Sequence, residues 1–239
     1  MGSLFEIAKS GIQAYRQALA VTGQNIANVN TEGYSKRDVA LEEIGGVQGG
    51  VTDVSDQSGL GVRVEEIRRS FNEYITERLR SSHSSYEQIN QFSKEINILE
   101  NDLLPEGSDL STFIGKFFSS LQEIAAAPED SAPRTIAMEA GKDLANAFND
   151  NSARLSQTQN GAFTQTKLVL DKVNILSTEL ANVNAKLKSA GATTKANDLL
   201  DTRDLLLEQL SKEIQFTTVY GNRGDVTIRL GNSGQGPVL

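Results

Sequence analysis

The chain has 239 residues, which allows one large domain or two modest domains with a real apolar core. It carries 23 lysines and arginines against 31 aspartates and glutamates, a net charge of −8 that argues against nucleic acid or an anionic lipid surface as a partner. No apolar run approaches the roughly 18–20 residues that cross a bilayer. The absence of cysteine excludes thiolate chemistry, and the one histidine, His83, leaves little for histidine metal sites or catalytic triads. We interpret His83 as an ordinary helix residue.

The N-terminal segment 4–29 predicts a long helix with a narrow apolar stripe. The stripe recurs in alternating steps of three and four residues, which is the 3.5-residue period of a coiled-coil seam. Such a seam requires a partner helix, and we expect none within this chain, so the helix should fray in a monomer and order on assembly. The seam residues are Phe5, Ala8, Ile12, Tyr15, Leu19, Thr22, Ile26 and Val29.

The segment after this helix predicts a turn and two strands. Residues 28–33 end the helix, and Gly33 is the residue best suited to a positive φ. Strand-like stretches follow at 34–44 and 61–67, which predicts an extended or hairpin element. The glycine-rich tract 45–60 between them predicts a flexible loop, since its spacing fits neither a P-loop nor a dinucleotide fingerprint.

Long helices are predicted over most of the remaining chain. Ser70 and Glu73 form a capping box that opens a helix running to Pro105, and a shorter helix follows over 110–125. The longest helix should cover 134–190, and another 195–214. We expect the stripe Tyr86, Ile89, Ile96 and Leu99 to contact the stripe Val169, Val173, Leu176, Leu180 and Val183. The expected core residues of this rod are Ile96, Leu99, Val173, Leu176, Leu180, Leu200 and Leu210.

After residue 214 the pattern changes from helix to sheet. Stretches 216–220 and 226–230 predict two strands joined by a four-residue turn, and a lone hairpin is barely stable, so we expect a fragment of a longer protein. The predicted fold class is mainly α: an elongated bundle of long coiled-coil-like helices, with a small hairpin after the first helix and the start of a β domain at the end. The expected segments are 1–34, an assembly helix and turn; 35–69, hairpin and loop; 70–214, helical rod; and 215–239, a truncated β-rich domain.

Three motifs carry a resemblance to a known family. The run Asn25-Ile26-Ala27-Asn28-Val29-Asn30-Thr31-Glu32-Gly33-Tyr34-Ser35-Lys36-Arg37 resembles the N-terminal signature of flagellar rod, hook and hook-associated proteins. The run Asn197-Asp198-Leu199-Leu200-Asp201-Thr202-Arg203-Asp204 and its continuation to Leu210 are similar to an element of hook-associated proteins. Residues 117–122, with Pro128-Glu129-Asp130 downstream, are similar to a stretch of a hook–filament junction protein. The signature-turn residues are Asn25, Asn28, Thr31, Gly33 and Tyr34.

The resemblance implies a structural role at the hook–filament junction of the bacterial flagellum. It implies export by the flagellar type III apparatus without a cleavable signal peptide, and an extracellular location. The implied partners are copies of the chain in a ring or tube, the hook protein, the second junction protein and the export apparatus. It implies a family C-terminal helix that pairs with the N-terminal helix. No cofactor, metal, nucleic acid, membrane or small-molecule substrate is expected.

Other interpretations stay open from the residues alone. One is another axial protein, such as the second junction protein, a hook protein or a rod protein. Another is a non-flagellar secreted coiled coil that binds a soluble partner, against which the N-terminal signature argues. An enzyme would have to use Asp201, Arg203, Asp204 and Glu208, but acidic and basic runs of this kind on helices are usually solvated ion-pair faces.

Overall fold

The structure, a computed structural model, describes residues 2–44, 61–103, 109–190 and 194–239. Contacts divide it into two compact units, Met1–His83 with Leu176–Leu239, and Ser84–Ile175. The four segments expected from the sequence follow chain order, whereas these units group residues by contact, so the segment boundaries stay a prediction. The flexible loop predicted over 45–60 lies outside the described residues.

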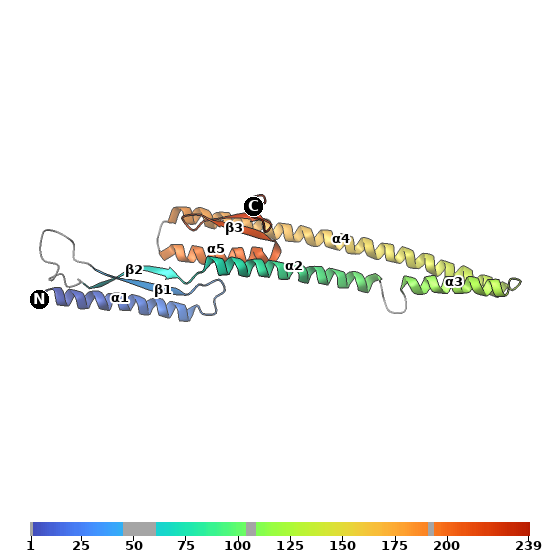
Figure 1. The fold of residues 1–239 in the computed structure, drawn as a ribbon, viewed down its shortest axis with the longest axis horizontal. Coiled ribbons are helices and arrows are strands. Elements are labelled where there is room, and N and C mark those ends of the chain that lie inside the picture. The colour runs from blue at the N-terminus through green and yellow to red at the C-terminus, as the bar shows by residue number, and fades with distance from the viewer. Residues whose placement is uncertain (1, 45–60, 104–108, 191–193) are drawn as a thin grey trace. The chain divides into compact units, whose positions relative to one another are not determined.

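The described elements are mostly helices, as the sequence predicts (Figure 1). The helices are α1 (Gly2–Ala27), α2 (Glu73–Leu103), α3 (Leu110–Ala126), α4 (Ser131–Ala190) and α5 (Thr194–Glu213). The strands are β1 (Arg37–Glu43), β2 (Val62–Arg69), β3 (Phe216–Tyr220) and β4 (Val226–Leu230). The predicted fold class is confirmed as mainly α, with one antiparallel hairpin after the first helix and a second two-stranded sheet at the end.

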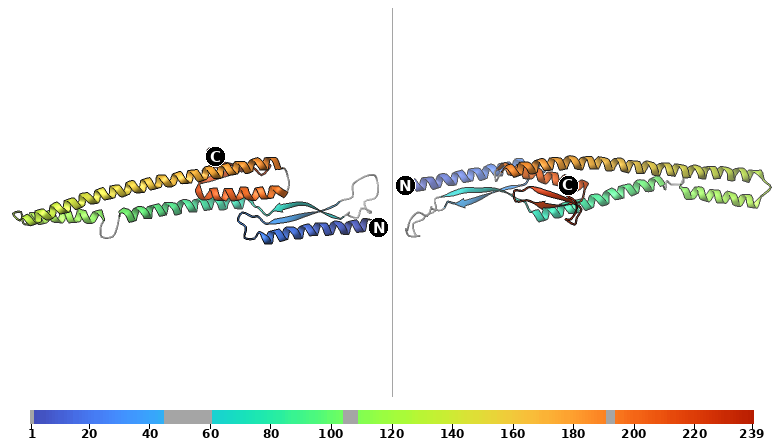
Figure 2. Two further views of the ribbon diagram at one scale, coloured as in Figure 1. Left: turned by 180° about the vertical axis from the view of Figure 1, so that it is seen from behind. Right: turned by 90° about the horizontal axis from the view of Figure 1, so that it is seen from above.

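In the first unit, α1 lies along the β1–β2 hairpin, and the views of Figures 1 and 2 agree on this arrangement. β1 and β2 pair antiparallel, with Arg37 opposite Arg69 and Val39 opposite Ile67, and the register shifts between Ala40 and Leu41. We call α1, the turn after it and this hairpin the arm. The sequence pattern did not indicate this contact, because it concerned a partner helix for the seam, whereas it is the opposite face of α1 that covers the hairpin. The absence of a partner helix for the seam stays a prediction.

The rest of the first unit is built on α5. Figure 1 shows α5 running antiparallel beside the last turns of α4, with β3 and β4 next to them. Apolar side chains that are at most 7% exposed form this core: Leu176, Leu180, Val183, Leu187, Leu206, Leu207, Leu210, Val226 and Ile228. The side-chain amide of Asn184 ties α4 to β4, because it donates to the carbonyl of Val226 and accepts from the Val226 N–H.

The second unit is a set of helices without strands among its described residues. α3 and the first part of α4 form a helical hairpin, in which Gly141 of α4 approaches the ring of Phe117 of α3. Asp109 is the N-cap of α3, and its carboxylate accepts from the Thr112 N–H at 2.8 Å. Ile96 and Leu99 of α2 line a shallow groove with Leu155 and Ala162 of α4, so these two helices also lie side by side.

The predicted register between α2 and α4 is wrong. Tyr86 and Ile89 are 63% and 69% exposed, and Ile96, expected in the core, is 44% exposed. The last turns of α4 are buried instead in the first unit, which contains α5 and the strands β3 and β4. A heptad stripe repeats every seven residues, so its pattern indicates that a helix needs a partner without choosing which turn of that partner it meets.

The start of α2 also differs from the capping box predicted at Ser70. The N–H of Ser70 donates to the Lys36 carbonyl at 2.7 Å, which holds Ser70 in the hairpin ladder. Asn72 accepts from the Ile75 N–H at 3.1 Å and caps the helix, which begins at Glu73. The β-ladder hydrogen bond therefore excludes Ser70 from the helix that its sequence pattern predicts.

Candidate functional site: an exposed seam and an arginine–aspartate joint

The first helix has two faces with different environments. Ala14 and Val21 are 3% and 5% exposed on the side that covers the hairpin. Every residue of the predicted seam is classed as exposed, and the large ones range from 63% to 75%. These large exposed seam residues are Phe5, Ile12, Tyr15, Leu19, Ile26 and Val29. The helix is thus held by one face and presents the other.

Small residues allow the close approach of α1 to the hairpin. Ser10, Ala14 and Ala18 lie on the covered side of the helix, where large side chains would push the strands away. The Ser10 hydroxyl accepts from the N–H of Val62 at 3.2 Å. This contact fixes the N-terminal half of α1 to the start of β2.

The carboxamide of Asn25 fixes the other end of α1 to β1. Its Nδ2 donates to the Arg37 carbonyl at 2.8 Å, and its Oδ1 accepts from the Arg37 N–H at 2.9 Å. The Tyr34 hydroxyl donates to the same Oδ1 at 2.9 Å. The amide therefore replaces the hydrogen bonds that a third strand would make with Arg37, which gives the first residue of the signature a specific role.

The turn between α1 and β1 completes this end of the arm. The Thr31 N–H donates to the Asn28 carbonyl at 3.0 Å, and the Tyr34 N–H donates to the Thr31 carbonyl at 3.2 Å. Gly33 has φ of +79°, so the predicted positive φ is confirmed. Gly33 also lies against Leu205 of α5, where an added Cβ would come within 3.0 Å of the Leu205 Cβ.

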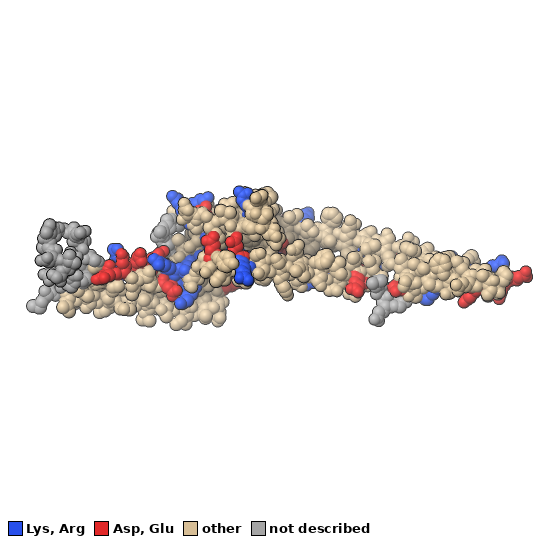
Figure 3. Space-filling view, in the orientation of Figure 1, with Lys and Arg blue, Asp and Glu red and all other residues tan. Residues whose placement is uncertain are grey.

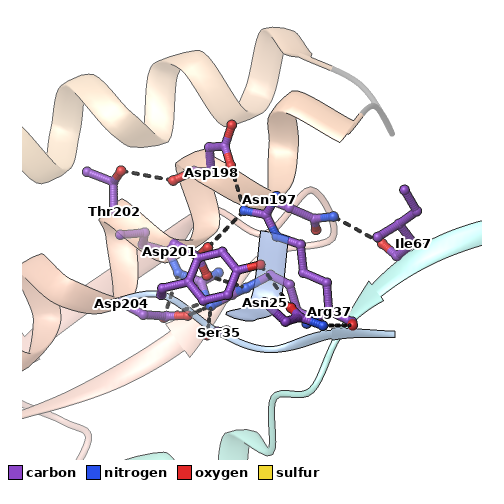
Figure 4. A network of polar contacts seen from close by, with 12 residues as sticks. Asn25, Ser35, Arg37, Ile67, Asn197, Asp198, Asp201, Thr202 and Asp204 are labelled. Atoms are coloured by element: carbon purple, nitrogen blue, oxygen red, sulfur yellow. Dashed lines mark hydrogen bonds and ion pairs between the residues drawn. The ribbon is translucent and has the colours of Figure 1, made fainter. Parts of the chain in front are cut away.

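The arm meets α5 through charged side chains, which Figure 4 shows at close range. Arg37 binds Asp198 at 2.6 Å and Asp201 at 3.1 Å. Arg69 binds Asp201 at 2.8 Å and Asp204 at 2.6 Å. The aspartates follow one another at intervals of three residues, which places them along one face of α5. We call these five residues the joint.

Most side chains of the joint are buried. The side chains of Arg37 and Arg69 are 9% and 6% exposed, and those of Asp201 and Asp204 are 12% and 11% exposed. Only Asp198, at 72%, is open to solvent. Buried charges of this kind persist only when they are paired, and each of these is in an ion pair, although the Nε of Arg37 has no hydrogen-bond partner.

A second pair of arginines extends the joint into the body of the unit. Arg80 of α2 and Arg203 of α5 both bind Asp204, at 3.2 and 2.7 Å. Arg80 also donates to the Tyr220 hydroxyl of β3 at 2.9 Å. The guanidinium of Arg203 lies 4.9 Å from the Tyr220 ring centre and 5.9 Å from that of Phe71. One carboxylate therefore connects β2, α2 and α5.

The charge of Arg37 is secured by its surroundings. Its burial would lower the pKa, but the hydrogen bonds and negative charges of Asp198 and Asp201 outweigh burial and raise the pKa above its ordinary value. Arg37 also lies 5.1 Å from the ring centre of Tyr34. Arg37 therefore keeps its positive charge at neutral pH.

The structure corrects the interpretation of the acidic run on α5. The sequence pattern favoured a solvated ion-pair face for Asp201, Arg203, Asp204 and Glu208, but Asp201 and Arg203 are buried and Asp204 binds three arginines. Sequence reasoning also missed Arg69 and Arg80 as their partners. The available signal was the Lys36-Arg37 end of the signature, which already placed a cation next to the turn.

Other kinds of site find no support in the described part of the chain. No group of three or more histidines, aspartates and glutamates there has the arrangement of a metal site. None of the described helices combines the length and apolar character of a membrane span. Of the expected core residues, Val173, Leu176, Leu180 and Leu210 are buried, while Leu99 and Leu200 are half-buried.

An N-terminal helix with an exposed seam, joined to a body of long helices, is the construction of an axial assembly protein. Consistent with this class, the family model for the flagella basal body rod protein matches residues 5–34. The model described as the flagellar hook-associated protein FlgK helical domain matches residues 96–239, which is more than half of the chain. The chain belongs to this FlgK family of flagellar hook-associated proteins.

Similar proteins from distant bacteria support this assignment. Flagellar hook-associated protein 1 of Salmonella typhimurium is 26% identical over 235 residues, covering 97% of this chain. Flagellar hook-associated protein 1 of Bacillus subtilis is 26% identical over 226 residues, covering 92% of this chain. The chain spans 42% and 44% of the lengths of these two relatives.

A solved structure shares the fold. The flagellar hook junction protein FlgK from Burkholderia pseudomallei aligns with a TM-score of 0.58 at 23% sequence identity. The alignment covers 64% of this chain and 27% of that one. The likeness supports the helical architecture described above.

Proposed function

We propose that this chain is a structural component of the flagellar axial tube at the hook–filament junction, and that the exposed seam of α1 is its assembly surface. The observation that carries the proposal is that α1 contacts the hairpin with one face and exposes the other. The helix is anchored to the hairpin by Ser10 and Asn25, while the large apolar residues of the seam stay 63–75% exposed. A contiguous apolar stripe of this size on a folded helix is typical of a protein–protein interface.

The surface next to the seam supports the same role. On the face drawn in Figure 3, charged side chains gather over the hairpin, whereas the visible surface of α1 is uncharged. A groove of about 650 Å³ lies between α1 and β1, and Ile26 and Val29 of the seam line it together with Val39. A helix laid along the seam could therefore insert side chains between α1 and β1.

The free energy available from the seam is large enough for assembly. Six large side chains at roughly 1.5 kcal/mol each give on the order of 9 kcal/mol on full burial, before the cost of association. That gain exists only with a partner helix. As partners we propose other copies of this chain in a ring or tube, the hook protein and the second junction protein. The names of the relatives, hook-associated and hook junction proteins, support this choice.

The same resemblance supports the remaining parts of the proposal. We propose export through the flagellar type III apparatus without a cleavable signal peptide, and a location outside the cell. We propose no catalytic role, since the aspartates of the dense polar cluster in the described part of the chain are already paired with arginines. The C-terminal helix that the family resemblance implies would be one occupant of the seam.

The test is complementation of a strain that lacks its own copy of this gene. Ile12→Glu and Leu19→Glu place charges in the seam, so the tagged protein should be produced but not incorporated into flagella, and swimming should be lost. Gln13→Glu, on an exposed neighbouring position, is the matched control and should assemble normally. Normal incorporation of both seam variants would contradict the proposal.

A further inference from the structure

The arm is built as one body. Ser10 and Asn25, four helical turns apart on α1, bind β2 and β1 respectively, so both ends of the helix are tied to the hairpin. These contacts lie wholly inside the arm. A displacement of the arm relative to α5 therefore need not break any of them.

The contact between the arm and α5 is mainly polar. Besides the approach of Gly33 to Leu205, it contains the two arginines at the base of the hairpin, the aspartate row of α5, and the side chain of Asn197, which donates to the Ile67 carbonyl at 3.0 Å. Ion pairs and bidentate hydrogen bonds depend steeply on direction, whereas apolar contact does not. A polar contact of this kind fixes the angle between the arm and α5 more than it adds to the free energy of their association.

Asp201 occupies the central position in that contact. One of its oxygens binds Arg37 and the other binds Arg69, and these arginines stand on different strands. We propose that Asp201 is the positioning residue of the arm. Because its carboxylate binds both strands at once, it sets the direction of α1 relative to α5. Asp198 binds only Arg37 and is exposed, and Asp204 is shared with Arg80 and Arg203. Neither can replace it.

This inference does not depend on the proposed function, because it concerns the isolated chain. The absence of cysteine makes the test clean, since two introduced cysteines become the only sites for spin labels. Labels at Gln13→Cys on α1 and Lys212→Cys on α5, both exposed positions, measure the distance between the arm and α5, which we call the arm-to-body distance. Labels at Gln13→Cys and Glu43→Cys measure a distance within the arm, which we call the internal distance.

Pulsed electron–electron double resonance on the full chain measures both distances. The arm-to-body distribution should be a single narrow peak in the parent, remain so in Asp198→Asn, and lose its single peak in Asp201→Asn. Arg37→Gln should have the same effect as Asp201→Asn, and Asp201→Glu should give a narrow but displaced peak. The internal distance should stay narrow in every variant.

Two outcomes would overturn the proposal. If Asp201→Asn and Arg37→Gln keep the parent arm-to-body distribution, other contacts set the angle. If the internal distance broadens together with the arm-to-body distance, the arm unfolds instead of changing its direction as one body. Asp201 would then contribute only to stability. Circular dichroism on each variant distinguishes a turned arm from an unfolded chain.

Discussion

Arg37 and Arg69 lie directly opposite each other on β1 and β2, although like charges at facing positions of a strand pair repel. The arrangement is stable because the carboxylate of Asp201 lies between them and binds both. The hairpin base is therefore complementary to α5 in charge and geometry. It is this relationship that joins the N-terminal signature to the aspartate motif near the other end of the chain.

The first prediction is a strong energetic coupling between Asp201 and Arg69. Asp201→Asn should destabilise the parent because it leaves two buried arginines facing each other, and should cost much less in an Arg69→Gln background. A double-mutant cycle from denaturant unfolding should give a coupling of about 2–3 kcal/mol. The exposed pair Arg63 and Glu42 is the control and should give less than about 1 kcal/mol. Equal couplings for the two pairs would be evidence against a buried joint.

The second prediction concerns the geometry of Arg203. Its guanidinium lies near two aromatic rings, binds Asp204 and donates to the Gly224 carbonyl, and the side chain is 3% exposed. Arg203→Lys keeps the charge but loses the planar fork, so it should still destabilise the protein by at least about 1 kcal/mol, and Arg203→Ala by about 3 kcal/mol. Thermal unfolding measures both. Wild-type stability of the lysine variant would show that charge alone matters there.

The third prediction compares two glycines of the N-terminal region. Gly33→Ala should destabilise by about 1–2 kcal/mol, because its φ is +79° and the new Cβ would press on Leu205. Gly23→Ala, inside α1 with open space around it, should be neutral or stabilise by up to about 1 kcal/mol. Opposite signs in chemical denaturation are expected. Gly33→Val should in addition impair assembly, since it disturbs the turn that leads from the seam to the hairpin.

The fourth prediction is a pH dependence at the start of α3. Hydrogen bonds from the Thr112 side chain and backbone and from Ser111 lower the pKa of Asp109 below its ordinary value of 3.8. A lowered folded-state pKa contributes stability that is complete above the ordinary value and is lost as pH falls through the folded-state value. A carboxyl-carbon NMR titration should therefore give a pKa under 3.8. A pKa at or above that value would contradict the capping geometry.

Local sequence patterns predicted most of the elements but fewer of their contacts. The turn at Gly33 and the strands at Phe216–Tyr220 and Val226–Leu230 follow from glycine conformation and β-propensity, which act over a few residues. The pairing of α2 with α4 did not follow, because heptad stripes fit several registers. Helix α1 has a second face of small residues that contacts the hairpin. The periodic spacing of large apolar residues does not indicate this face, because small residues contribute little to that pattern.

The joint was hidden for a related reason. Asp201 and Asp204 have the spacing of an ordinary exposed helix face, and their partners Arg37, Arg69 and Arg80 come from distant parts of the chain. No local rule connects residues separated by more than a hundred positions. Two of the three motifs that carry the family resemblance nevertheless meet in this contact, one through Arg37 and the other through the aspartates, although nothing in either motif alone indicates that they meet.

The central claim is that the outward stripe of α1 contacts another subunit in the flagellum while the inward face stays on the hairpin. A photo-crosslinking amino acid at Leu19, which is 72% exposed, tests it most directly in assembled flagella. We expect adducts of the labelled chain with a second polypeptide, and far fewer from the same label at Lys212 on α5. Crosslinking from Leu19 only within its own chain, in flagella that have incorporated the protein, would contradict the claim.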